Sequence, residues 1–276
     1  MTEIRFIVGT GRSGTRTMFR MLTGADKVEI HHEYNVLLVQ KIGLLYHSGL
    51  MSRDECAARI SEIYTPALLH SSENIWVDSS NKCAWIVEIL AELYPSAKFL
   101  NLVRDGRKVV PSFYYKLREE MYDDLSTAAT TKFIEKPTDV ELMPPLEKKY
   151  WWYIPVQSQN EFAEFKRYNR FERCCYHWNY VNAMVLEKFT QIKSTNCMTV
   201  KLEDLVSDIS EIKRVLYFLG VDYDPIYLEY LKTPRNVFHP LDYQIAAKFQ
   251  VSFKNICKPM MQKLGYLDRE GYTVEY

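Results

Sequence analysis

The 276-residue chain lacks a net charge of either sign. Lysine plus arginine and aspartate plus glutamate each count 35, so the formal charge at neutral pH is zero. Chains adapted to nucleic acid usually carry a basic excess, and this composition therefore disfavours a nucleic-acid partner. Any anion site must be a local cluster of cations rather than a field spread over the whole surface.

The chain also lacks a long apolar run and a regular cysteine framework. No stretch is long and apolar enough to span a bilayer, and no apolar signal region opens the sequence. The six cysteines show no C-x-x-C spacing, which favours reduced and mostly buried thiols. A dense set of carboxylates is missing as well. We therefore expect a cytoplasmic protein without a membrane partner and without a metal site.

Short apolar runs alternate with helical patterns along most of the chain. The runs predict strands at Ile4–Val8, Ile75–Val77, Lys98–Val103 and Met198–Leu202. Apolar spacing and end signals predict helices at Thr15–Leu22, Arg53–Tyr64, Ala84–Tyr94, Arg107–Arg118 and Ile209–Leu219. This alternation predicts an α/β fold with a mainly parallel central sheet flanked by helices.

One stretch, at about residues 122–169, breaks that alternation. It holds four prolines and the aromatic cluster Tyr150, Trp151, Trp152 and Tyr153. We expect a helical and aromatic insertion over the carboxyl edge of the sheet, where the cluster could wall an acceptor site. Packing of the insertion on its own aromatic residues explains the cluster equally well. The length then suits one domain over residues 1–276 that carries this insertion.

A glycine-rich segment connects the first expected strand to the first expected helix. Glycines allow close backbone approach to an anion, and the amides of a helix N-terminus point at it. The expected binding residues are Gly11, Arg12, Ser13, Gly14, Thr15, Arg16 and Thr17. The segment lacks the Gly-Lys-Ser/Thr of nucleoside-triphosphate loops, because Thr15 follows Gly14. The lysine and the magnesium-binding hydroxyl of that apparatus are therefore not expected here.

Three segments in order resemble the sulfotransferases that use 3′-phosphoadenosine-5′-phosphosulfate (PAPS). Residues 12–15 look like their 5′-phosphosulfate loop. Residues 99–112 are similar to their 3′-phosphate motif, in which an arginine at a strand end precedes a serine by eight positions, here Arg104 and Ser112. Residues 201–205, followed by 218–220, resemble their late strand and next helix. Without the first loop, an Arg104–Asp105 ion pair and a surface serine would explain the second segment.

The resemblance implies a P-loop-like nucleotide fold of the sulfotransferase type, in a soluble, bacterial small-molecule enzyme. Such an enzyme would move a sulfuryl group from PAPS to a hydroxyl or to an amine or guanidinium nitrogen, and release adenosine 3′,5′-bisphosphate (PAP). Arg12 would meet the charge on the leaving oxygen, Arg16 the 5′-phosphate, and Arg104 with Ser112 the 3′-phosphate. The acceptor stays open; a natural-product alkaloid of the saxitoxin type is one guess.

The acceptor needs a base to take its proton. Glu33 matches the position of the glutamate used by the glycan branch of the family, and the neighbouring His31 and His32 titrate in a useful range. The small-molecule branch uses a histidine near the next strand, which residues 76–82 lack, and Asp78 is the substitute there. The sequence leaves the base open among these four residues.

Two other functions stay possible at this point. A small-molecule or nucleotide kinase with a variant phosphate loop is one, and the missing Gly-Lys pair counts against it. An inactive nucleotide-binding protein is the other, and the intact set of cations in the two motifs counts against that.

Overall fold

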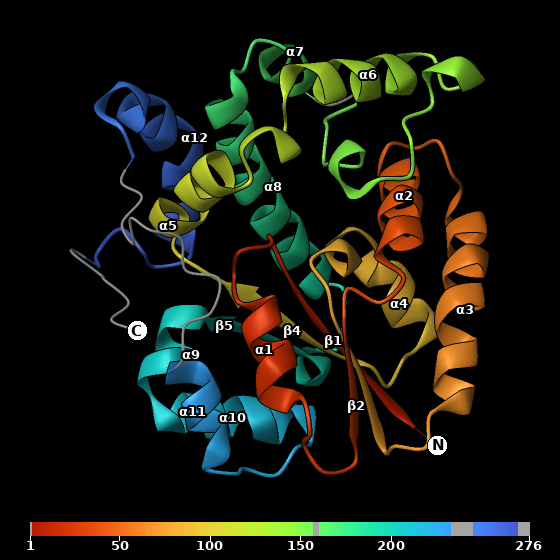
Figure 1. Ribbon diagram of the computed structural model, residues 1–276, viewed down its shortest axis with the longest axis vertical. Coiled ribbons are helices and arrows are strands. Elements are labelled where there is room, and N and C mark those ends of the chain that lie inside the picture. The colour runs from red at the N-terminus through yellow and green to blue at the C-terminus, as the bar shows by residue number, and fades with distance from the viewer. Residues whose placement is uncertain (1, 157–159, 233–244, 270–276) are drawn as a thin grey trace.

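The central sheet of the protein has five strands, all parallel (Figure 1). The computed structural model describes residues 2–156, 160–232 and 245–269. Its strands are β1 (Glu3–Gly9), β2 (Val28–His32), β3 (Ile75–Ser79), β4 (Lys98–Val103) and β5 (Cys197–Lys201). They pair in the order β2-β3-β1-β4-β5. The prediction of an α/β fold with a parallel central sheet is confirmed.

Helices fill the connections between the strands. They are α1 (Thr15–Leu22), α2 (Val36–His47), α3 (Arg53–His70), α4 (Val87–Leu93), α5 (Gly106–Pro111), α6 (Asp124–Glu135), α7 (Phe162–Phe165), α8 (Arg170–Phe189), α9 (Leu202–Ser207), α10 (Ile209–Leu219), α11 (Ile226–Lys232) and α12 (Gln250–Lys263). In the described ranges, no helix combines the length and the apolar character that crossing a membrane requires. All six cysteines lie in these ranges as free thiols, and five of them are buried.

Alternating side chains of the strands build a core on each face of the sheet. On β1, Phe6 and Val8 belong to the core shared with α2, α3, α4, α8 and α12. Ile7, between them, belongs to the core shared with α1, α9, α10 and α11. The central strand β1 is thus buried on both faces, as expected for a parallel sheet. Figure 1 shows the two groups of helices on different sides of the strands.

The connections that leave neighbouring strands diverge at the carboxyl end of β1. The chain leaves β1 into α1, on one face of the sheet. It leaves β3 through a 3₁₀ turn (Lys82–Ile86) into α4, and leaves β4 into α5, both on the opposite face. Ligands of open α/β sheets bind at such a point. The glycine-rich loop lies there.

Several predicted elements have their predicted bounds. The strand Lys98–Val103 and the helices Thr15–Leu22 and Ile209–Leu219 are confirmed residue for residue. Gly220 ends the last of these with φ of 79°, a left-handed conformation that glycine adopts without steric cost. The sequence did not predict β2, because its polar residues hide the alternation of a strand.

The sequence predicts a helix over Arg107–Arg118 with Pro111 near its start or at a kink, and the helical winding changes at Pro111. The α-helix ends at Pro111, and one π-helical turn, Ser112–Lys116, follows before a short 3₁₀ turn. Pro111 has no backbone N–H, so it cannot continue the regular hydrogen-bond pattern of the helix. Wider turns of this kind are frequent at functional sites. The change in winding decides where Ser112 lies.

Residues 122–169 hold α6, α7 and two 3₁₀ turns, and both helices lie at the top of the view, beyond the carboxyl end of β1 (Figure 1). Arg173 of α8 holds the start of this stretch, because its Nη1 donates to the Tyr122 carbonyl at 3.2 Å and to Asp124 at 2.6 Å. The Trp151 indole donates to the Pro145 carbonyl at 2.7 Å, within the same stretch. The stretch that the sequence predicts as an insertion thus packs partly on its own aromatic residues.

Candidate active site

The loop between β1 and α1 has a backbone that favours glycine. Gly11, Arg12 and Gly14 have φ of 80°, 57° and 111°, and Arg12 is the one that bears a side chain. A Cβ added at Gly14 would lie 2.7 Å from Cδ1 of Leu202, so the loop packs directly against the start of α9. Close packing and left-handed turns explain why this segment is rich in glycine.

The N-terminus of α1 lacks a stabilising side chain of its own. No side chain caps it, and no acidic residue lies in its first turn. The Ser13 hydroxyl beside it is fully buried and makes no hydrogen bond. A buried hydroxyl without a partner costs about 1–3 kcal/mol, and an anion would supply the missing acceptors. The loop therefore fits a phosphate or sulfuryl group.

Arg12 links this loop to the second predicted motif. Its Nε donates to Oγ of Ser112 at 3.0 Å, and its carbonyl accepts a hydrogen bond from Nη1 of Arg104 at 3.2 Å. Arg104 follows β4, and Ser112 opens the π-helical turn. The structure thus brings the predicted 5′ and 3′ phosphate residues into one hydrogen-bonded group.

Hydrogen bonds from side chains fix the backbone around Arg104. The Trp178 indole donates to the Arg104 carbonyl at 3.0 Å. The next amide, of Asp105, donates to the buried Glu203 carboxylate at 2.9 Å, and the Tyr266 hydroxyl donates to the same carboxylate at 2.8 Å. Glu203 lies in the late motif, so that motif supports the strand end that carries Arg104.

The alternative interpretation of residues 99–112 required an ion pair between Arg104 and Asp105, but the Asp105 side chain has another partner. It pairs with the Arg107 guanidinium at 2.6 Å and caps the first turn of α5. The described contacts show no Arg104–Asp105 ion pair.

Another cation, which the sequence did not single out, lies near the loop. Lys116 comes from the π-helical turn that also carries Ser112. Burial, and then the charges of Arg12 and Arg16, lower the pKa of Lys116 to about 8. Arg16 itself is exposed on the first turn of α1. Cations that disfavour one another's charge in this way favour an anion between them.

Glu33 lies at the carboxyl end of β2, among polar groups. Its carboxylate is 12% exposed and accepts a hydrogen bond from Nδ2 of Asn81 at 2.6 Å. Its other oxygen pairs with the Lys148 ammonium of the insertion. Burial alone would raise the pKa of Glu33, but Lys148, Lys82 and His32 together lower it. Glu33 is therefore ionised and held in one orientation.

Lys82 is the functional candidate that sequence reasoning missed. It follows β3 by three positions, and 1% of it is exposed. Its Nζ lies 4.0 Å from the centre of the Trp152 ring and 5.2 Å from that of Trp85. Burial, and then the charge of Lys148, lower the pKa of Lys82 to about 7. A buried lysine at the carboxyl end of a strand was the signal that could have found it.

The two histidines of β2 point to opposite faces of the sheet. His31 bonds to Glu29 at 2.7 Å through Nε2 and packs against Trp76. His32 donates from Nδ1 to the Ser79 carbonyl at 2.8 Å and stacks on Phe19 of α1. Neither histidine is hydrogen-bonded to the Glu33 carboxylate in the described contacts.

Asp78 lies inside the protein, below the surface that carries Glu33. It is fully buried and accepts hydrogen bonds from the Tyr34 amide at 3.1 Å and the Tyr64 hydroxyl at 2.8 Å. Burial raises its pKa to about 6. The Tyr34 contact fixes the backbone that follows Glu33, so Asp78 supports this part of the site.

The match with known proteins decides the family. The model of the sulfotransferase family matches residues 5–142, half of the chain. The chain belongs to the sulfotransferase family. Among curated proteins, a sequence search gives no match.

Solved sulfotransferase structures share the fold of this chain. The sulfotransferase domain from the curacin biosynthetic pathway is 14% identical, with 96% of this chain and 98% of that one covered at a TM-score of 0.50. The sulfotransferase domain of the Synechococcus PCC 7002 olefin synthase is 16% identical, with 94% and 96% covered at a TM-score of 0.51. The predicted P-loop-like fold of the sulfotransferase type is confirmed.

The aromatic cluster at residues 150–153 of this sulfotransferase supports both interpretations, packing within residues 122–169 and a wall of the site. Trp151 packs on Phe133 inside the insertion. Trp152 instead faces Lys82, and its indole nitrogen is buried without a hydrogen-bond partner. The cluster therefore both packs the insertion and carries a free donor to the neighbourhood of Lys82.

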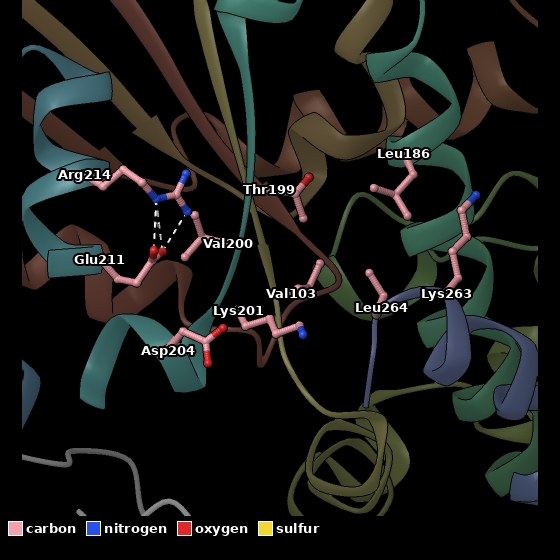
Figure 2. Close-up of a pocket in the computed structure, with 10 residues that line it drawn as sticks. All are labelled: Val103, Leu186, Thr199, Val200, Lys201, Asp204, Glu211, Arg214, Lys263 and Leu264. Carbon is pink, nitrogen blue, oxygen red and sulfur yellow. Dashed lines mark hydrogen bonds and ion pairs between the residues drawn. The ribbon is translucent and has the colours of Figure 1, made fainter. Parts of the chain in front are cut away.

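The sulfotransferase also has a cavity apart from these residues. It measures about 410 Å³ and lies along the outer edge of β5 (Figure 2). Figure 2 shows the Glu211–Arg214 ion pair on one side of the strand and Leu186 with Lys263 on the other. None of the predicted site residues lines it. We therefore assign the candidate active site to the loops at the carboxyl ends of β1–β4.

Proposed function

We propose that this sulfotransferase moves the sulfuryl group of PAPS to a hydroxyl, amine or guanidinium group of a small molecule and releases PAP. The observation that carries the proposal is Arg12, which joins the glycine-rich loop to both Arg104 and Ser112. These cations and hydroxyls would then bind the two phosphate positions of the donor from one continuous edge. A kinase would need no 3′-phosphate site.

The donor would lie with its 5′ side in the loop. The amides of α1 and the Ser13, Thr15 and Thr17 hydroxyls would bind the 5′-phosphosulfate, with Arg16 and Lys116 nearby. Arg104 and Ser112 would bind the 3′-phosphate, because guanidinium groups form paired, charge-assisted hydrogen bonds to phosphate oxygens. Arg12 lies between the two groups and would act on both.

The transfer itself depends on positioning and charge. As the bond from sulfur to the bridging oxygen breaks, negative charge grows on the leaving PAP, and Arg12 would stabilise that charge. Lys82 would direct its ammonium at the sulfuryl oxygens. Its burial and the lack of a carboxylate in hydrogen-bond contact with its Nζ, within the described residues, support this role.

Glu33 would take the proton of the acceptor. Its carboxylate is ionised, and Asn81 and Lys148 hold it beside Lys82, which supports it over the other three candidates. His31 and His32 make their contacts on the two faces of β2, and the Asp78 carboxylate is already bonded by Tyr34 and Tyr64.

The acceptor would be a small metabolite. A natural-product alkaloid with a guanidinium group, of the saxitoxin type, is one candidate. The likeness to a sulfotransferase domain from the curacin pathway supports natural products as the first class to screen.

Two measurements test the donor. Thermal unfolding should shift upward with PAP and hardly at all with ATP and magnesium. Transfer of label from PAPS to a panel of acceptors should then survive a chelator. Stabilisation by ATP and strict dependence on magnesium would favour the kinase. Binding of PAP without turnover of any acceptor would favour an inactive nucleotide-binding protein.

A further inference from the structure

A buried histidine supports the glycine-rich loop from behind. His177 lies on α8, which passes beside the end of β1 (Figure 1), and 3% of it is exposed. Its Nε2 lies 2.9 Å from the Thr10 carbonyl oxygen. A carbonyl oxygen only accepts hydrogen bonds, so Nε2 carries the proton and donates it. Burial, as the largest effect, lowers the pKa of His177 to about 3, so the ring is neutral.

The other nitrogen of the ring faces the insertion. Nδ1 lies 3.0 Å from the Tyr122 hydroxyl oxygen, whose single proton goes to the Tyr153 carbonyl. The same hydroxyl lies 2.6 Å from the Tyr153 carbonyl. The rings of Phe113 and Trp152 pack on the imidazole with centroids at 5.3 and 5.8 Å. These contacts leave the imidazole a single orientation, with Nε2 toward the loop.

The bond to Thr10 also orients the next amide. In a trans peptide the C=O and the N–H point in opposite directions. With the Thr10 carbonyl held by His177, the Gly11 N–H points away from α8. Gly11 has φ of 80°, so the chain turns back there and wraps the next residues around the space in front of α1.

We propose that His177 is a positioning residue for the donor, which aims the Gly11 amide at the phosphosulfate group. Through Tyr122 it also ties the loop to the insertion that carries Trp152 and Lys148. The inference rests on the proposed use of PAPS. A histidine that only fills the core would contribute stability, and its loss would not single out donor binding.

Two substitutions of His177, whose side chains differ in length, separate a positioning role from a role in core packing alone. In His177→Gln the amide nitrogen can take the place of Nε2 and donate to Thr10. In His177→Asn the amide nitrogen lies nearer the place of Nδ1 and falls short. Both are polar, so both disturb the core. His47 is a matched control, since it is also a buried histidine, packs on Tyr153 and Tyr180, and makes no hydrogen bond to the loop in the described contacts.

The measurements are PAP affinity by calorimetry, kcat and KM for PAPS, and the melting temperature. We expect His177→Asn to weaken PAP by about tenfold, the usual effect of one lost hydrogen bond to an anion site. His177→Gln should recover most of that loss. His47→Phe, which removes a buried ring nitrogen without a hydrogen-bond partner, should leave PAP affinity unchanged. Tyr122→Phe should raise the KM for the acceptor more than that for PAPS.

The outcomes separate this inference from the proposed function. If the wild-type protein does not bind PAP, the proposed donor is wrong. If wild type binds PAP and the Gln and Asn variants bind it equally well, the positioning role of His177 is overturned. An equal loss of affinity in His47→Phe would overturn it too, because the effect would then come from the core in general.

Discussion

The proposed donor side and the proposed acceptor side of the candidate site are built differently. The donor side consists of backbone features of one short loop and the first turn of one helix, with φ above zero at Gly11, Arg12 and Gly14. The acceptor side consists of side chains that meet from far apart, such as Glu33 and Lys148, 115 positions away. A motif can therefore encode the first, while only packing of the insertion assembles the second.

Their charges differ as well. On the donor side Arg12 and Arg16 oppose the charge of Lys116, and the described carboxylates lie behind the loop, at Glu203 and Asp105. On the acceptor side the Lys148 ammonium faces the Glu33 carboxylate. The donor side is thus prepared for an anion, whereas the acceptor side holds an ion pair that suits proton transfer. Substitutions should separate the two sides.

The largest effect is expected from the acceptor side alone. Glu33→Gln removes the base and keeps the shape, so the single-turnover rate should fall about 100- to 10,000-fold. PAP affinity, measured by calorimetry, should be nearly unchanged. A single-turnover rate close to normal would end the role of Glu33. The base would then be the residue whose variant, among His31→Ala, His32→Ala and Asp78→Asn, loses the rate but keeps PAP affinity.

Lys82→Met tests whether the buried ammonium belongs to the chemistry. Loss of one preorganised charge typically costs about 100-fold or more in kcat. The pKa of Lys82 is lowered to about 7, so its charge is present below that pH and lost as pH rises through it. The kcat/KM of wild type should therefore fall above pH 7, and this limb should vanish in the variant.

Lys148→Met is the matched control for that profile. It removes the cation that lowers the pKa of Glu33, so the acid limb of kcat/KM should move to higher pH. The basic limb should also move to higher pH without vanishing, because the charge of Lys148 lowers the pKa of Lys82 as well. A basic limb that persists in Lys82→Met would instead show that another group causes it.

Arg104→Ala should act on the donor side alone. Loss of a paired, charge-assisted contact should weaken PAP about 100-fold. Adenosine 5′-phosphate, which has no 3′-phosphate, should lose far less affinity in the same titration. Arg104→Lys keeps the charge without the paired geometry and should lie between. An equal loss for both nucleotides would place Arg104 away from the 3′-phosphate.

The smallest difference between the effects on donor affinity and on rate is expected for Arg12, which contacts both motifs. Arg12→Ala should weaken PAP by about tenfold, because the contact to Ser112 is lost. Its effect on kcat should be larger, since the leaving charge is small before the bond breaks. Donor affinity and single-turnover rate for the same variant give the two numbers. Equal losses would make Arg12 a binding residue only.

The sequence predicted the fold and the strand, loop and helix at the end of β1 for a physical reason. Strand, glycine-rich turn and helix are local features, and α1, β4 and α10 have their predicted bounds. It failed at β2, where Glu29, His31 and His32 hide the strand pattern. It predicted a possible kink at Pro111 but not the π-helical turn that follows this proline.

By itself the sequence determined that this chain would place hydroxyls, cations and a helix N-terminus at the end of its first strand. Neighbouring residues suffice for that, because glycine, strand and helix preferences act over a few positions. Only the tertiary structure decided that Lys148 meets Glu33, that Lys82 lies against Trp152, and that His177 reaches Thr10 across 167 positions. Contacts of that span depend on how whole layers pack, and no local pattern specifies them.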